Sequence, residues 1–202
     1  MSSNGQAGRG IKGYGQLARS SHLLGSAVRE ILDIQTLRDV SPLPLSVAQF
    51  HLLKLISLNG AHQVNEVAEF LGVSGPATTK NIDKLVQLEL LSRTPSQRDR
   101  RAQILTVSPR GRRLVRRYEE LTATRLKKVL REFRPREVEQ LSQLMERFAV
   151  ALYAAGGVDG GCCLRCAAHI QDHCSIGELR GGCPYLRSRK ARDRQATREG
   201  AT

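Results

Sequence analysis

The sequence predicts a mainly α-helical fold with a small β-hairpin wing, that is, a winged helix-turn-helix flanked by N- and C-terminal helices. Three observations lead to this fold class. Apolar residues recur at helical spacing in several separate stretches of the chain. Two short strand-like segments follow one of these stretches directly. A turn with three arginines joins the two segments, so that a helix is followed by a basic hairpin.

The predicted helix before the hairpin begins at Ser74, whose hydroxyl can accept a hydrogen bond from an unpaired amide of the first turn. Pro76 falls in that turn, where its missing N–H does no harm. The inner face is an apolar stripe made of Ile82, Leu85, Val86 and Leu88. The outer face is short, polar and cationic, and consists of Ala77, Thr78, Thr79, Lys80, Asn81 and Lys84. Such a face suits a helix that lies in a major groove of DNA.

The predicted hairpin has its first strand around Leu91 and Arg93 and its second around Ile104, Leu105 and Val107. The turn between them reads PSQRDRR. A narrow minor groove concentrates negative potential and attracts arginine. The turn arginines are therefore candidates for contact with the groove next to the helix, namely Arg98, Arg100 and Arg101.

Three helices are predicted before this unit. A long first helix extends from about Tyr14 to Val40. Ser46 and Gln49 form a capping box at the start of the second helix, which runs to about Leu58. A short third helix, about 64–71, precedes the helix of the cationic face, and the two form the helix-turn-helix pair.

Two helices are predicted after the hairpin. Ser108 as N-cap and Pro109 at the first helical position begin the fifth helix. Its first turns carry a run of arginines, which is usually a solvated face, although here it directly follows the wing. Pro135 begins a sixth helix that ends at Gly156.

Composition restricts the partners of the chain. It has 202 residues, a net charge of +13 and a pI near 10.2. A strongly basic balance favours a polyanionic partner, nucleic acid first and an anionic membrane second. No apolar run approaches the ~20 residues that a membrane span needs, and the N-terminus has no signal-peptide pattern. We therefore expect a cytoplasmic protein that does not enter a membrane.

From about Leu45 to Arg112 the chain resembles the MarR family of bacterial transcriptional regulators. The matching segments are LSVAQFHLLKLI, VNEVAEFLGVSGPATTKNIDKLVQLELLSR and the wing QRDRRAQILTVSPRGRRL. The wing contains the Asp-x-Arg of the family as Asp99-Arg100-Arg101, followed by Leu105-Thr106 and Gly111 where relatives have Leu-Thr-x-x-Gly. Two positions depart from the pattern. Relatives usually have Gly where this chain has Glu89, which predicts a strained or shifted helix end. Gly75-Pro76 replaces residues that relatives often use near DNA.

The resemblance implies a homodimer whose first and last helices form the interface. It also implies binding to double-stranded DNA and a cleft for a small aromatic ligand. With the outer-face and N-terminal residues of the helix and the wing arginines, the predicted DNA-contacting set is Ser74, Thr78, Thr79, Lys80, Lys84, Arg98, Arg100 and Arg101. By resemblance, Asp99 does not touch DNA but braces the wing through a nearby arginine.

All five cysteines lie in a C-terminal extension. With Cys162 spare, they follow the pattern C-x₂-C-x₇-C-x₈-C, made of Cys163, Cys166, Cys174 and Cys183. Four thiolates can hold zinc or an iron–sulfur cluster, and the irregular spacing slightly favours the cluster. A thiol redox switch and an inert tail are the alternatives. On a straight helix Cys166 and Cys174 would be ~12 Å apart, so a shared site requires a turn between them.

The sequence therefore predicts four regions. They are an N-terminal disordered tail (1–13), a winged-helix domain (14–155), a cysteine-rich extension (156–186) and a basic disordered tail (187–202). Within the domain, 14–44 and 109–155 are dimerisation helices and 45–108 is the DNA-binding lobe. An alternative hypothesis is an iron–sulfur or zinc redox protein that uses the winged helix for protein contacts. We expect no enzyme and no organic cofactor, since no nucleophile–base set or phosphate-binding glycine loop is found.

Overall fold

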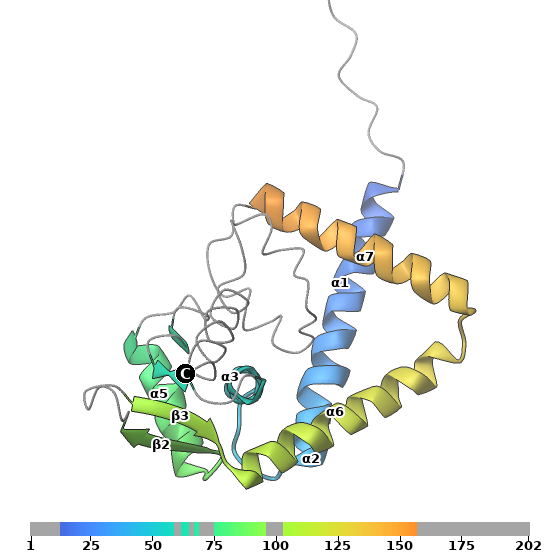
Figure 1. Ribbon diagram of the computed structural model, residues 1–202. Helices are drawn as coiled ribbons and strands as arrows, with labels where there is room; N and C mark the ends of the chain where they lie inside the picture. Colours follow the sequence, from blue (N-terminus) through green and yellow to red (C-terminus); the bar gives the residue numbers. More distant parts are fainter. Residues whose placement is uncertain (1–12, 59–61, 65–66, 69–74, 96–102, 157–202) are drawn as a thin grey trace, which may run out of the picture.

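The computed structural model describes residues 13–58, 62–64, 67–68, 75–95 and 103–156. The described part is mainly helical, with a small antiparallel sheet at one end (Figure 1). This arrangement confirms the predicted fold class. Its elements are α1 (Tyr14–Ala27), η1 (Val28–Gln35), α2 (Thr36–Val40), α3 (Val47–Ser57), β1 (His62–Gln63), α5 (Gly75–Gln87), β2 (Leu91–Pro95), β3 (Gln103–Val107), α6 (Pro109–Leu130) and α7 (Pro135–Gly156).

The predicted first helix is found, but its geometry is not uniform. α1 passes without a break into the π-helical segment η1, which passes into α2. In η1 the wider turn leaves backbone carbonyls that side chains use instead. Thr36 donates its hydroxyl to the carbonyl of Ile31, 2.9 Å away. A π segment of this kind frequently marks a functional site in a helix.

The second helix, α3, begins as its sequence predicts. The amide of Gln49 donates to the hydroxyl of Ser46, and the Gln49 side chain accepts from the Ser46 amide, at 3.2 and 3.0 Å. This reciprocal capping box fixes where the helix starts. The predicted third helix lies mostly outside the described residues. Val67, which falls within its predicted range, is described and fully buried.

The sheet has three strands in the order β1-β3-β2, and both pairs are antiparallel. β2 and β3 are the predicted hairpin, with Leu91 opposite Val107 and Pro95 opposite Gln103. The third strand, β1, was not predicted. Its two residues pair with Ile104 and Leu105 of β3, so the sheet reaches back to the segment that follows α3.

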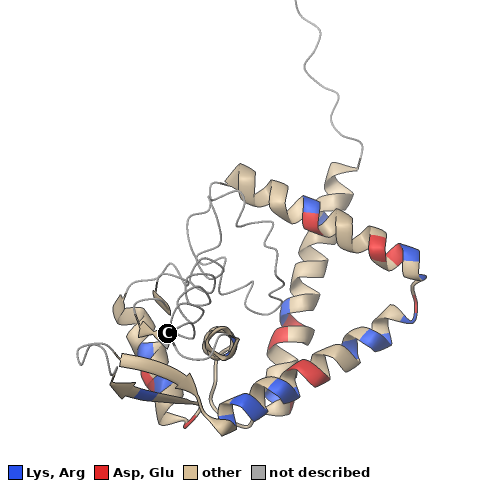
Figure 2. Ribbon diagram, viewed as in Figure 1, with Lys and Arg blue, Asp and Glu red and all other residues tan. Residues whose placement is uncertain are grey.

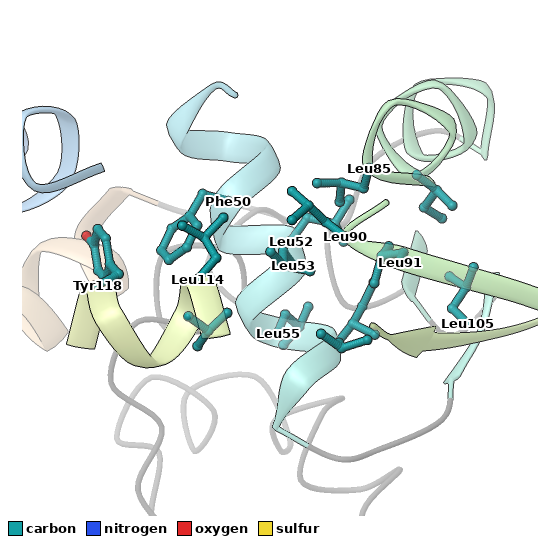
Figure 3. Close-up of a cluster of buried hydrophobic side chains, with 14 of the residues drawn as sticks. Phe50, Leu52, Leu53, Leu55, Leu85, Leu90, Leu91, Leu105, Leu114 and Tyr118 are labelled. Atoms are coloured by element: carbon teal, nitrogen blue, oxygen red, sulfur yellow. The ribbon is translucent and has the colours of Figure 1, made fainter. Parts of the chain in front are cut away.

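The hydrophobic core lies between α3, α5, the sheet and the first half of α6 (Figure 3). Leu53 of α3, Leu85 of α5 and Leu105 of β3 are each fully buried in it. At its edge Phe50 packs on Tyr118 of α6, with ring centroids 4.3 Å apart. Because each element contributes to one cluster, α5 and the hairpin are held as one unit.

Two long helices follow this unit: α6 extends from it obliquely, and α7 runs back so that in this view it crosses the upper part of α1 (Figure 1). α6 starts with the predicted Ser108 cap, whose hydroxyl accepts from the amide of Gly111 at 2.9 Å, and with Pro109. α7 begins at Pro135 as predicted and has no buried residue. None of the described helices is long and apolar enough to cross a membrane.

Candidate nucleic-acid interface

The outward face of α5 is the centre of the candidate site. Ile82 and Leu85 fix the inner face because both are fully buried. On the opposite side Thr79 and Lys80 are exposed, and Lys84 is half-buried. None of these three makes a side-chain hydrogen bond or an ion pair with the part of the chain that the structure describes. Their polar groups therefore face solvent, as the predicted DNA-contacting face requires.

Thr78 must be removed from that face. The sequence predicted it beside Thr79 and Lys80, but its exposed fraction is 0%. Thr78 stands four residues before Ile82 and seven before Leu85, and these intervals place it on the inner stripe of the helix. Its side chain belongs to the packing of α5 on the lobe and does not reach a DNA groove.

An ion pair connects α5 to the wing. Nη2 of Arg93 on β2 lies 2.8 Å from Oδ1 of Asp83 on α5. Asp83 stands on the outer side of the helix, next to Lys80 and Lys84, where a free carboxylate would oppose a polyanion. The pair balances that charge and ties the orientation of the helix to the first strand of the hairpin.

The end of α5 shows the strain predicted at Glu89. Among the described residues it is the only non-glycine with a positive φ, at 58°. This left-handed conformation is the one that glycine adopts without penalty. The turn is held by α6. The Ser108 hydroxyl donates to the Glu89 carbonyl at 2.7 Å, and Arg110 lies 2.9 Å from the Glu89 carboxylate.

Gly111 lets α6 approach this turn closely. A Cβ at position 111 would overlap the carbonyl oxygen of Leu90 and approach Val107 Cγ1 to 2.8 Å. The position therefore requires glycine for reasons of space. As a result the start of α6 packs against the turn that ends α5, and both helices carry Lys or Arg positions (Figure 2).

A polar cluster lies behind the interface, where α3, η1 and α6 meet. Tyr118 donates to the carbonyl of Leu32 at 2.8 Å and to Asp33 at 3.4 Å. Asp33 Oδ1 lies 3.8 Å from Nε2 of the buried His51. Burial, followed by the charge of Asp33, raises the pKa of Tyr118 well above its ordinary value. Arg125 of α6 completes the cluster through Thr36 and Asp39.

The sequence did not reveal this cluster or the Asp83–Arg93 pair. Tyr118 and Leu32 of the cluster are 86 positions apart, and Asp83 and Arg93 lie ten positions apart on two different elements, so neither residue type nor spacing indicates these contacts. The burial of Thr78, in contrast, could have been found from its interval to Ile82 and Leu85.

Several predicted site residues lie outside the described residues. They are Ser74, the wing-tip residues Arg98, Asp99, Arg100 and Arg101, and the cysteines Cys163, Cys166, Cys174 and Cys183. Their predicted roles stay predictions. Within the described ranges, no group of three or more His, Cys, Asp or Glu side chains is arranged to hold a metal ion.

Comparison with known proteins agrees with this geometry. The sequence model of the MarR family matches residues 45–102, from the start of α3 into the wing. An uncharacterised HTH-type transcriptional regulator of Bacillus subtilis, YfiV, is 27% identical over 143 residues, which cover 66% of this chain and 89% of YfiV.

Solved structures share the fold. RV1404 from Mycobacterium tuberculosis superposes with a TM-score of 0.60 at 24% identity, covering 72% of this chain and 97% of RV1404. FabT from Streptococcus pneumoniae, solved in complex with DNA, has a TM-score of 0.59 at 18% identity, covering 67% of this chain and 96% of FabT.

Proposed function

We propose that the chain is a DNA-binding transcriptional regulator of the MarR family, whose sequence model matches residues 45–102, and that it acts as a homodimeric, sequence-specific repressor of near-palindromic operators. The chain is a regulator and not an enzyme. The observation that carries the proposal is the outward face of α5, where Lys80 and Thr79 stand exposed on a helix that packs on the core and that the Asp83–Arg93 pair joins to β2.

In this proposal α5 is the recognition helix. Thr79 and Lys80 lie nearest the base edges of a major groove and Lys84 flanks them, with Ser74 at the start of the helix. Arg98, Arg100 and Arg101 enter the adjacent minor groove, and Asp99 braces the wing. Phosphate contacts position the protein, whereas base contacts specify the sequence. The threonine hydroxyl and the lysine ammonium of α5 are thus the groups that read the operator.

Two chains are needed to present two such helices. On one side of α7 a stripe of apolar residues remains exposed, including Leu144 at 60% and Leu152 at 55%. α1 has no buried residue and exposes Leu17 at 50%. Contiguous apolar surface of this kind marks an interface. A twofold dimer through these helices would place its recognition helices about one DNA turn apart, ~34 Å.

The experiment is selection of duplexes from a random-sequence pool by the wild-type protein, followed by footprinting on the selected duplex. A dimer should protect two half-sites related by a twofold axis. Lys80→Ala and Arg101→Ala should abolish the preference over scrambled duplex. Lys127→Ala removes the same charge at the far end of α6 and is the control. Selection of no preferred sequence, or a monomer in sedimentation equilibrium, would refute the proposal. Unchanged DNA binding in the Lys80 and Arg101 variants would favour a role in protein contacts.

We further propose that DNA affinity is tuned by a small aromatic ligand, by the cysteine extension, or by both. Clustering of all five cysteines in the sequence supports the second route. There, Cys163, Cys166, Cys174 and Cys183 would hold an iron–sulfur cluster or zinc, or act as redox thiols. Anaerobic purification followed by an absorption spectrum and metal analysis distinguishes the iron–sulfur cluster, the zinc site and the redox thiols from one another. If the protein is colourless and metal-free and its DNA binding does not change with oxidants, control by a small ligand is the only one of these routes that remains.

A further inference from the structure

The start of α6 carries a concentration of positive charge that does not serve the helix itself. Its first nine residues are PRGRRLVRR, with five arginines, and its first turn contains no acidic residue. The amino end of a helix is the positive end of its dipole, where cations are unfavourable and anions are favoured. The acidic residues Glu119 and Glu120 come only after this segment. Arg110 and Arg112 in the first turn are therefore unfavourable for the helix, and Arg113 and Arg117 repel each other because like charges four residues apart lie on one face.

Two of the five arginines have structural partners. Arg110 pairs with Glu89, and Arg112 donates to the carbonyl of Val107. The other three, Arg113, Arg116 and Arg117, are exposed and make no side-chain hydrogen bond or ion pair with any residue that the structure describes. They lie on the side of α6 away from the buried Leu114 and Tyr118. We call these three residues the arginine face.

The arginine face is fixed relative to the recognition helix. Gly111 brings the helix backbone against Leu90, and Ser108 bonds both the amide of Gly111 and the carbonyl of Glu89. The N-terminal end of α6 thus packs directly on the turn that ends α5. Figure 2 marks Lys and Arg positions on the ribbon of α5, of β2 and of the beginning of α6, and these three segments lie in the lower part of the view. The nearby acids Asp83 and Glu89 are each paired with an arginine.

From this arrangement we infer that the arginine face is a second DNA-contacting surface, which binds sugar-phosphate backbone that the recognition helix and wing do not cover. The inference rests on the proposed DNA binding and extends it. Charge complementarity identifies the partner, since three guanidinium groups on adjacent turns match a row of phosphates. The contacts carry no base information, so they raise affinity for any duplex and lengthen the footprint.

The test compares two triple variants of the full chain. One is Arg113→Ala/Arg116→Ala/Arg117→Ala. The other, Lys127→Ala/Lys128→Ala/Arg131→Ala, removes three exposed cations from the far end of the same helix and gives the same net charge. Affinity is measured against salt concentration on the duplex selected by the wild type and on a scrambled duplex of equal length. The arginine variant should lose affinity on the order of 10²-fold on both duplexes. The slope of log affinity against log salt concentration should be shallower by about five for the dimer, because its two arginine faces lose about six phosphate contacts and each contact removes about 0.9 from the slope.

The control triple variant should keep an affinity and a salt dependence close to those of the wild type. On the selected duplex, hydroxyl-radical footprinting should show backbone protections that disappear only in the arginine variant, while the preference for the selected sequence persists. Equal losses in both triples would reduce the effect to overall charge and overturn the inference. So would dissociation of the arginine variant into monomers without DNA, or a loss of binding to anionic vesicles with unchanged DNA binding. If the wild type selected no sequence, the proposed function would fail, and the scrambled duplex would still test the arginine face.

Discussion

Arg93 on β2 and Asp83 on α5 form the link between the wing and the recognition helix, with 2.8 Å between Nη2 and Oδ1. Both side chains are partly exposed, 31% and 48%. A pair with this exposure contributes less than about 1 kcal/mol to stability. Its effect is therefore on charge and orientation at the surface that we propose binds DNA.

Replacing Asp83 by Asn should increase affinity for scrambled duplex by up to roughly tenfold at low salt, because a negative charge is removed and Arg93 is released toward phosphate. The preference for the selected duplex should fall, since the helix loses its anchor to the wing. Glu132→Gln makes the same change in charge far from α5 and should leave both quantities as they are. Weaker binding to scrambled duplex in Asp83→Asn would contradict this explanation. Titration of each variant against both duplexes at a fixed salt concentration measures these affinities.

Glu89→Gly should stabilise the protein by up to about 1 kcal/mol, because glycine adopts a φ of 58° without the penalty of a Cβ. The lost ion pair with Arg110 is exposed and offsets little of this gain. The midpoint of thermal unfolding should rise by a few degrees. Glu89→Ala is the matched variant. It loses the same carboxylate without relieving the backbone, so its midpoint should not rise.

Local signals in the sequence were sufficient for most helix starts. Ser46 with Gln49, and Ser108 with Pro109, are capping groups that act within three residues, and both are found as predicted. Glu89 at a glycine position likewise revealed the strained turn. These features are readable because both partners of each interaction lie in one short segment.

The rest depends on tertiary contacts. β1 has only two residues and forms because β3 presents an unpaired edge to it. The π geometry of η1 is accompanied by contacts from Tyr118 and Arg125, some 90 positions away. Thr78 was misplaced because its polar side chain was assigned to the outer face, although its intervals of four residues to Ile82 and seven to Leu85 place it on the inner stripe.

Gly111→Ala should destabilise the domain by about 1–3 kcal/mol, since the new methyl group overlaps backbone at Leu90 and cannot be accommodated by a change of rotamer. Gly15→Ala in α1 is the control. Nothing lies within 4 Å of a Cβ there, and alanine is the better helix former, so stability should be equal or slightly higher. Urea unfolding monitored by circular dichroism gives both values. Equal stability of the two variants would show that α6 can move away from Leu90.

Thr79→Ala should weaken binding to the selected duplex without changing the unfolding free energy by more than about 0.5 kcal/mol, as expected for an exposed position. Thr78→Lys should instead lower the unfolding free energy of the lobe, because it places a charge at a fully buried position. This loss of stability should precede any effect on DNA binding. Parallel titration and unfolding of the two variants tests the corrected face of α5. A stable Thr78→Lys variant with tighter DNA binding would restore the original assignment.

Tyr118 should make the protein sensitive to alkali. Burial and then Asp33 raise the pKa of its phenol in the folded state, whereas in the unfolded chain it titrates near 10. The folded state therefore holds the proton more tightly, and its contribution is complete below about pH 10 and is lost progressively above it. The unfolding free energy of the wild type should fall with rising pH in that range. Tyr118→Phe should reduce this dependence while losing about 1 kcal/mol at neutral pH, because the Leu32 carbonyl loses its donor. Tyr14→Phe, at a side chain 75% exposed, should keep the wild-type profile. An unaltered alkaline slope in Tyr118→Phe would show that other groups govern it.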